Sequence, residues 1–205
     1  MKILLIGSQG CGKGTVGSML SDYLSIPLIS AGHILREVSE NHPRKKEIQD
    51  YMARGELVPQ DLVADLLREE TSKDSSKNGF IFDGWGRTLM DLNFYDPDFD
   101  KVIFISISPE TSVKRISSRR TCDNCGSVFN VVSVPPKVEG ICDECGGELI
   151  QREDDTEEAV RRRLQIFNTE TSDVIEHFRN EGKLVEIDGE GSPEEVFKLA
   201  LEALK

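Results

Sequence analysis

A glycine-rich loop near the start of the chain restricts its fold more than any other feature. The loop runs from Gly7 to Gly14 and matches the pattern G-x-x-x-x-G-K. It follows the continuous apolar run Ile3–Ile6 and precedes apolar residues at helical spacing, beginning at Val16. This order predicts a buried parallel strand, a tight turn and a helix.

The same loop predicts a binding site for phosphate groups. Its glycines let backbone N–H groups turn toward phosphate oxygens, and the helix that follows offers its positive end. Lys13 supplies a charge for the outer phosphates, while Gly14 separates it from Thr15, the hydroxyl expected near magnesium. A glycine-rich turn that binds nothing is the alternative. The phosphate-binding residues are expected to be Gly10, Cys11, Gly12, Lys13, Gly14 and Thr15.

Strands and helices alternate along the rest of the chain. Short apolar runs predict further strands at 27–29, 80–82, 102–107 and 184–187. Helical spacing covers 31–39, 43–53, 61–71 and 110–118, and resumes near Thr156 and after a capping box at Ser192. We therefore predict an α/β fold with a doubly wound, parallel, five-stranded sheet of the P-loop NTPase type. Ligands of such sheets bind at the carboxyl ends of the strands.

Charge and hydropathy exclude several classes of partner. The 205 residues carry a formal net charge of -12, whereas nucleic acids and anionic membranes attract positive surfaces. No stretch approaches the length of a membrane span, and Ile3–Ile6 is too short for a signal peptide. We therefore expect a cytoplasmic location, where thiols stay reduced. We also expect a monomer, because no exposed apolar stripe is evident in the sequence.

Four of the five cysteines form two C-x-x-C pairs, which 16 residues separate. The pairs are Cys122 with Cys125 and Cys142 with Cys145. This spacing predicts a tetrahedral, structural zinc site, with disulfides or iron as alternatives. The fifth, Cys11, lies within the phosphate loop, where it fills a tight turn or, alternatively, makes the protein sensitive to oxidation.

Several short motifs share an order and spacing with one known family. They are G-K-G-T at 12–15, I-S-A-G-H-I-L-R at 29–36, G-E-L-V at 55–58, D-G-W-G-R-T at 83–88, S-R-R at 118–120, R-x-D-D from Arg152 through Asp154 to Asp155, and V-R-R-R-L at 160–164. Together they resemble the long-lid, zinc-binding branch of the adenylate kinases over essentially the whole chain.

The resemblance implies a nucleoside-monophosphate kinase that moves the terminal phosphoryl group of ATP to AMP, with Mg²⁺ accompanying ATP and a structural Zn²⁺. It divides the chain into a core (1–29, 59–117 and 156–205), an acceptor-binding insertion (30–58) and a lid (118–155). The catalytic cations would be Lys13, Arg87, Arg119, Arg152 and Arg163. Further ATP contacts would come from Arg115, Arg119, Val128, Phe129 and Gly191. Acceptor contacts would come from Ala31, Arg36, Glu56, Leu57, Val58, Gly84, Trp85, Gly86, Arg87, Asp91, Arg152 and Arg163. Asp83 would orient magnesium-bound water.

These residue types suit the reaction on chemical grounds. Phosphoryl transfer between two nucleotides brings several negative charges together, so catalysis consists largely of positioning and neutralisation. The acceptor oxygen is already ionised near neutral pH and needs no base. Arg115 and Arg119 lie four residues apart in a predicted helix and are expected to share one face.

The chain departs from the family pattern at five positions. Gln9 and Gly86 replace prolines, His33 replaces an aspartate, and Asp91 stands where an adenine-reading glutamine is expected. Ala31 replaces a threonine and is similar to UMP/CMP kinases, which makes a UMP/CMP-type or relaxed-specificity kinase the alternative. A more distant alternative is an ATP-switched zinc-ribbon interaction module, or a scaffold without activity.

Overall fold

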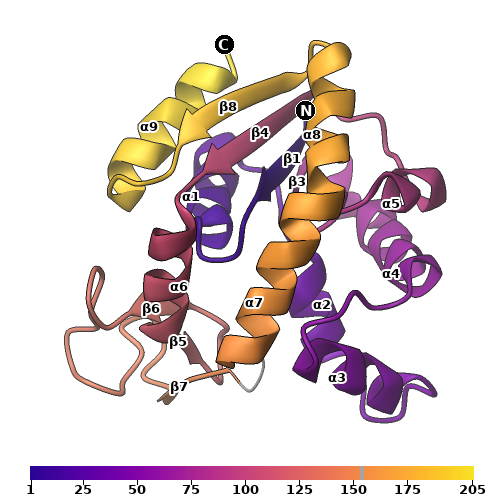
Figure 1. Ribbon diagram of the computed structural model, residues 1–205. Helices are drawn as coiled ribbons and strands as arrows, with labels where there is room; N and C mark the ends of the chain where they lie inside the picture. The colour runs from indigo at the N-terminus through magenta and orange to yellow at the C-terminus, as the bar shows by residue number, and fades with distance from the viewer. Residues whose placement is uncertain (153–154) are drawn as a thin grey trace.

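The computed structural model describes residues 1–152 and 155–205 and contains a parallel sheet of five strands in the order β2-β3-β1-β4-β8 (Figure 1). The strands are β1 (Lys2–Gly7), β2 (Leu28–Ser30), β3 (Phe80–Asp83), β4 (Lys101–Ser106) and β8 (Leu184–Asp188). All four strand pairings are parallel. The predicted fold class is therefore confirmed, and each predicted strand exists with ends shifted by one or two residues.

The register of the sheet brings three strand ends to one edge. Asp83, the last residue of β3, lies opposite Leu5 of β1 and Ser30 of β2. Gly7, which ends β1, lies opposite Ile105 of β4. The glycine-rich loop after β1 and the turn after β3 therefore leave the sheet side by side.

Helices cover both faces of the sheet. Leu4 and Leu5 are neighbours on β1, are both almost completely buried, and belong to different apolar clusters. Leu4 packs with side chains of α4 (Gln60–Ser72) and α8 (Ser172–Asn180). Leu5 packs with side chains of α1 (Lys13–Leu24) and α9 (Pro193–Ala203). Alternating side chains of a strand point to opposite faces, so burial of both requires a doubly covered sheet.

The cysteine-rich segment forms a separate antiparallel sheet. Its strands are β5 (Arg119–Cys122), β6 (Val128–Asn130) and β7 (Leu149–Ile150), in the order β6-β5-β7. The buried side chains of this sheet form a small cluster of Cys122, Phe129, Cys142 and Leu149. Two of these four residues are cysteines, so apolar burial alone stabilises this segment weakly.

Two helical segments lie near this sheet. Helices α2 (Ala31–Glu37) and α3 (Lys45–Ala53) follow β2, and α7 (Glu157–Ile166) follows the cysteine-rich segment. Between α7 and α8 the chain forms a π-helical turn, Phe167–Thr171. In Figure 1, α7 stands between the small sheet and the α2–α3 segment. Within the described residues, no helix is both long and apolar enough to cross a membrane.

Three local features differ from the sequence expectations. Helix α5 (Leu89–Phe94) and a 3₁₀ turn (Asp74–Ser76) were not predicted, because both are too short for a periodic pattern. Helix α6 (Pro109–Ser117) ends before Arg119, which begins β5. The expectation that Arg115 and Arg119 share a helix face is therefore wrong.

Candidate active site

The glycine-rich loop has the backbone geometry of a phosphate cradle. Gly10 and Gly12 have φ angles of 84° and 93°, which side chains other than glycine rarely adopt. Gly12 is the N-cap of α1, so the free N–H groups of that helix face the loop. A cradle of this kind, with the positive end of the helix dipole behind it, favours a phosphate anion.

Lys13 bends back over the loop. Its Nζ donates to the carbonyls of Gly7 and Ser8, at 2.6 Å and 3.0 Å, and lies 3.4 Å from the Cys11 sulfur. The Cys11 side chain is 1 % exposed and belongs to the apolar cluster between the sheet and α1. This burial favours the interpretation of Cys11 as a residue that fills a tight turn.

Helix α6 contacts the glycine-rich loop through a side-chain hydrogen bond. The Ser112 hydroxyl donates to the carbonyl of Gln9. Ser8 Oγ and Gln9 Oε1 are buried in the loop and have no hydrogen-bond partner among the described residues. Buried polar atoms without partners are rare in proteins, so their presence here suits a ligand that brings its own hydrogen-bonding groups.

Asp83 faces the loop from the end of β3. Its carboxylate accepts from Ser30 Oγ at 3.3 Å, and it would lie 3.9 Å from a Cβ placed on Gly14. Carboxylate and hydroxyl oxygens, such as those of Asp83 and Ser30, are donors of the type that Mg²⁺ prefers. The residues at this position therefore fit a magnesium ion that accompanies a nucleotide.

Two other arginines and Asp83 lie near Arg87. Burial lowers the pKa of the Arg87 guanidinium, and the nearby charges of Arg163 and Arg36 lower it further, while Asp83 and Asp91 oppose the shift. Such mutual effects require these groups to be close together. Arginine stays protonated even after such a shift, so the cluster is a concentrated positive charge that attracts a polyanion.

Small residues make room for two of these arginines. A Cβ on Gly32 would lie 3.2 Å from an Arg36 nitrogen, and a Cβ on Gly84 would lie 3.4 Å from an Arg87 nitrogen. The same Gly84 position would be 3.8 Å from the side chain of Ala31. The predicted acceptor residues of 31–36 and 84–87 are therefore neighbours in space.

The other predicted arginines have defined partners. Arg119 donates through Nε to Asp155 at 2.9 Å and through a second nitrogen to the other oxygen of that carboxylate. Arg152 Nε donates to the Thr121 hydroxyl at 2.8 Å. Asp154, the other acid of the R-x-D-D motif, lies outside the described residues. Both arginines therefore belong to the base of the cysteine-rich segment.

Arg115 holds the loop that follows β8. Its guanidinium donates to the carbonyls of Gly189, Glu190 and Gly191, at 2.8, 3.0 and 3.3 Å. This places Arg115 beside Gly191, as two predicted ATP contacts should be. The other two predicted ATP contacts differ from each other in exposure. Val128 is 43 % exposed, whereas Phe129 is buried in the core of the small sheet.

Buried side chains and hydrogen bonds hold the turn after β3. Trp85 is buried and donates from its indole nitrogen to the Tyr95 carbonyl at 2.8 Å, and Gly86 has a positive φ of 63°. Asp91 is only 4 % exposed and completes a capping box with Thr88 at the start of α5. Its carboxylate also accepts from the Arg87 N–H at 2.7 Å. This geometry favours a role in building the turn over direct contact with a base.

The four paired cysteines form one cluster. Their sulfur atoms all lie within 4.8 Å of one another and could hold a metal ion. Cys122 and Cys145 are 3.4 Å apart and Cys125 and Cys142 are 3.6 Å apart, close to the spacing of about 3.8 Å expected for four sulfurs around zinc. All five cysteines are free thiols, and the side chain of Ser127, 3.1 Å from the sulfur, lowers the pKa of Cys125 to about 6.

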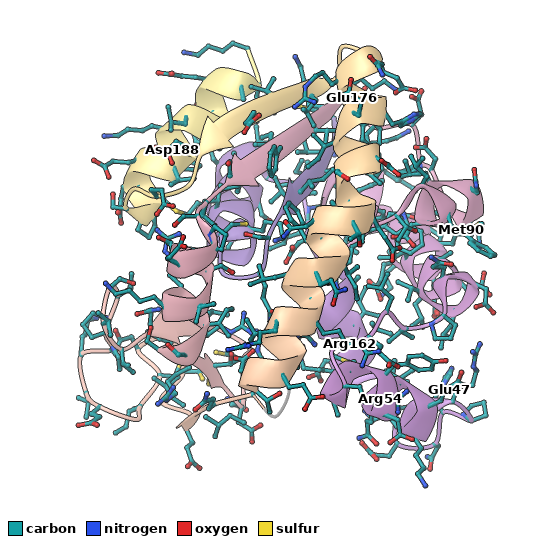
Figure 2. The ribbon with its side chains drawn as sticks, viewed as in Figure 1. Glu47, Arg54, Met90, Arg162, Glu176 and Asp188 are labelled. Atoms are coloured by element: carbon teal, nitrogen blue, oxygen red, sulfur yellow. The ribbon has the colours of Figure 1, made fainter. Side chains whose placement is uncertain are left out.

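Segment 30–58 contacts α7 and approaches the cysteine cluster. Glu56 pairs with Arg54 at 2.9 Å and with Arg162 of α7 at 3.0 Å, and Figure 2 shows Arg162 on the side of α7 that faces Arg54. Exposed His33 would lie 3.6 Å from a Cβ on Gly126, next to the first cysteine pair. The backbone at Gly55 and Glu56 is therefore held against α7, and Val58 is buried.

Comparison with known proteins identifies the family. A sequence profile of adenylate kinases matches residues 5–183. The chain belongs to the adenylate kinase family. Proteins named adenylate kinase from Thermosipho melanesiensis, Fervidobacterium nodosum and Caldicellulosiruptor bescii are each 41 % identical to it. The alignments cover all of this chain and 100 %, 97 % and 99 % of those relatives.

Sequence reasoning missed some residues of this adenylate kinase site. It assigned no role to Thr171, whose hydroxyl contacts Arg87, or to Arg162, which pairs with Glu56. Thr171 lies outside the quoted motifs and Arg162 has no role in the V-R-R-R-L motif by itself, because their partners lie 84 and 106 positions away in the sequence. Only the folded chain brings such distant groups together.

Proposed function

We propose that this protein is an adenylate kinase that converts ATP and AMP into two ADP by direct transfer of a phosphoryl group. The observation that supports this most strongly is the cluster of Arg36, Arg87 and Arg163 beside Asp83, at the sheet edge that also carries the Lys13 loop. Two polyanionic nucleotides could meet there end to end. The family relationship supports the same reaction.

The loop and its lysine would bind ATP. In this conformation Lys13 is hydrogen-bonded to the carbonyls of its own loop. A bound phosphate would replace these carbonyls as the partner of Nζ, with the loop N–H groups around it. Mg²⁺, when bound with ATP beside Asp83 and Thr15, would neutralise charge on the phosphates.

The arginines would bind the acceptor and stabilise the transferred group. Arg36 comes from α2, Arg87 from the turn after β3, and Arg163 from α7, where it also donates to the Met52 carbonyl at 3.2 Å. Guanidinium groups bind phosphate oxygens through two parallel hydrogen bonds, which fixes orientation as well as charge. No general base is needed, because the attacking oxygen of AMP is already ionised.

Two segments would close over the nucleotides. We assign residues 30–58 as the acceptor segment and 118–155 as the lid, with 1–29, 59–117 and 156–205 as the core. Arg119 and Arg152 lie at the base of the lid, so closure would bring them to the phosphates and exclude water. A Zn²⁺ held by the four cysteines would have no open coordination position and would act structurally.

Relaxed acceptor specificity is a second candidate. Asp91 stands where an adenine-reading glutamine is expected, and its carboxylate is occupied by Arg87 and Thr88. Adenine would then be recognised largely by packing and by backbone groups of Glu56, Leu57 and Val58. AMP is the expected acceptor, with CMP and UMP as the competitors to test.

A coupled assay with ATP and a panel of nucleoside monophosphates tests this function. We expect turnover that requires Mg²⁺ and is fastest with AMP. Turnover with CMP or UMP at the rate of AMP would support the relaxed-specificity alternative. ATP binding without turnover of any monophosphate would overturn the kinase assignment and favour the ATP-switched zinc-ribbon module. We further propose that the protein is a monomer in the cytoplasm. Its cysteines are free thiols, which suits a reducing compartment.

A further inference from the structure

The backbone of Arg87 is held by side chains on both sides. Its N–H donates to the carboxylate of Asp91 at 2.7 Å. Its carbonyl accepts from the hydroxyl of Thr171 at 2.8 Å, although Thr171 lies 84 residues further along the chain. Thr171 is 3 % exposed, so this hydrogen bond is shielded from water and is stronger than one at the surface.

Thr171 reaches Arg87 from an unusual piece of helix. It ends the π-helical turn Phe167–Thr171, between the α-helical segments α7 and α8. π-helical turns are rare and occur frequently at functional sites. A helix that gains one residue turns every later side chain by about 100° around its axis. The π-helical turn therefore decides which side chain of this helix faces the Arg87 loop.

A comparison within the same turn shows that this contact is specific. Thr169 is exposed, and its hydroxyl donates to the Gln165 carbonyl of its own helix at 3.0 Å. Helical threonines commonly bond in this way. The hydroxyl of Thr171 instead leaves its helix and contacts another segment of the chain.

Arg87 needs such support because of its neighbours. Its guanidinium stands near those of Arg163 and Arg36, and like charges repel when no anion lies between them. We propose that Thr171 is a positioning residue, whose hydroxyl fixes the main chain of Arg87 so that the guanidinium stays in the cluster before the acceptor phosphate arrives. This inference rests on the proposed role of Arg87 in binding that phosphate.

The variants Thr171→Val and Thr171→Ser test the inference, with Thr169→Val as the matched control. Valine keeps the shape of threonine and removes the hydroxyl, whereas serine keeps the hydroxyl and removes the methyl group. We expect Thr171→Val to lower kcat/KM for AMP by about 10- to 100-fold, the range that misplacement of a reacting group produces. KM for ATP should stay unchanged, and Thr171→Ser and Thr169→Val should behave like the wild type.

The results separate positioning from a purely structural role. Equal activity of Thr171→Val and the wild type would overturn the proposal, and so would equal losses in the serine and valine variants. The NMR signal of the Arg87 side-chain N–H supplies a readout without turnover: it should broaden in Thr171→Val and stay sharp in Thr171→Ser. A wild type without turnover on AMP would refute the proposed function, and the NMR comparison would still decide whether Thr171 orders Arg87.

Discussion

Arg119 and Asp155 form a two-point ion pair that joins the two ends of the segment 118–155. The Asp155 side chain is completely buried and the Arg119 side chain is 15 % exposed. The pair therefore fixes both hinges of the proposed lid relative to each other. It also leaves the Arg119 guanidinium oriented at the base of the lid, from where it would reach the phosphates.

Asp155→Asn should destabilise the protein. Removing one partner of a buried pair leaves the other charge uncompensated, at a cost of about 3 kcal/mol. We expect a lower thermal midpoint and slower turnover. Asp65→Asn is the control, because Asp65 pairs with Arg68 at an exposed position where the cost is about 0–1 kcal/mol. Similar midpoints for the two variants would contradict a structural role for the buried pair.

Arg87→Lys should abolish most activity. Lysine keeps the charge but lacks the planar fork that binds two phosphate oxygens. Loss of an arginine that stabilises transferred charge lowers kcat by roughly 10³-fold or more. Steady-state kinetics with ATP and AMP measure the effect, with Arg68→Lys on the protein surface as the control. Wild-type kcat in Arg87→Lys would remove Arg87 from the proposed site.

Glu56→Gln should raise KM for AMP and leave KM for ATP unchanged. The change removes the ion pair with Arg162, which holds the acceptor segment against α7. A partly exposed pair contributes about 0–1 kcal/mol, so a shift of at most about fivefold is expected. Glu47→Gln is the control, because it breaks a pair with Arg44 in the same segment without touching α7. If both variants raise KM equally, the link to α7 has no special role.

Removal of the bound metal should inactivate the enzyme while the core stays folded. Among the described residues of the lid, the apolar cluster consists of Phe129, Leu149 and two cysteines, so the folding energy of the lid would come largely from the metal. Protein that has been treated with a strong chelator, freed of it and then assayed with Mg²⁺ should therefore lack turnover, with little change in the circular dichroism of the parallel sheet, and added Zn²⁺ should restore turnover. Full activity in chelated protein whose metal content is zero would refute the structural site.

Residues close together in the sequence made much of the fold predictable. The apolar run Ile3–Ile6, the glycines after it and the helical spacing from Val16 specify a strand, a loop and a helix through local preferences. The two C-x-x-C pairs predicted one metal cluster, and the four sulfurs do lie together. Helix α5 was not predicted, because its six residues span less than two turns and show no periodic pattern.

The assembled site depended on contacts that no local pattern contains. The sequence by itself named the residues that we propose for the chemistry, because the loop and the cysteines are recognisable by type and spacing, and the arginines by the resemblance to the adenylate kinases. Only the tertiary structure decided that Asp91 supports a turn, that Thr171 holds Arg87, and that Glu56 meets Arg162. The physical reason is that these contacts need a burial and a distance that exist only after the helices have packed on the sheet, whereas local preferences act within a few residues.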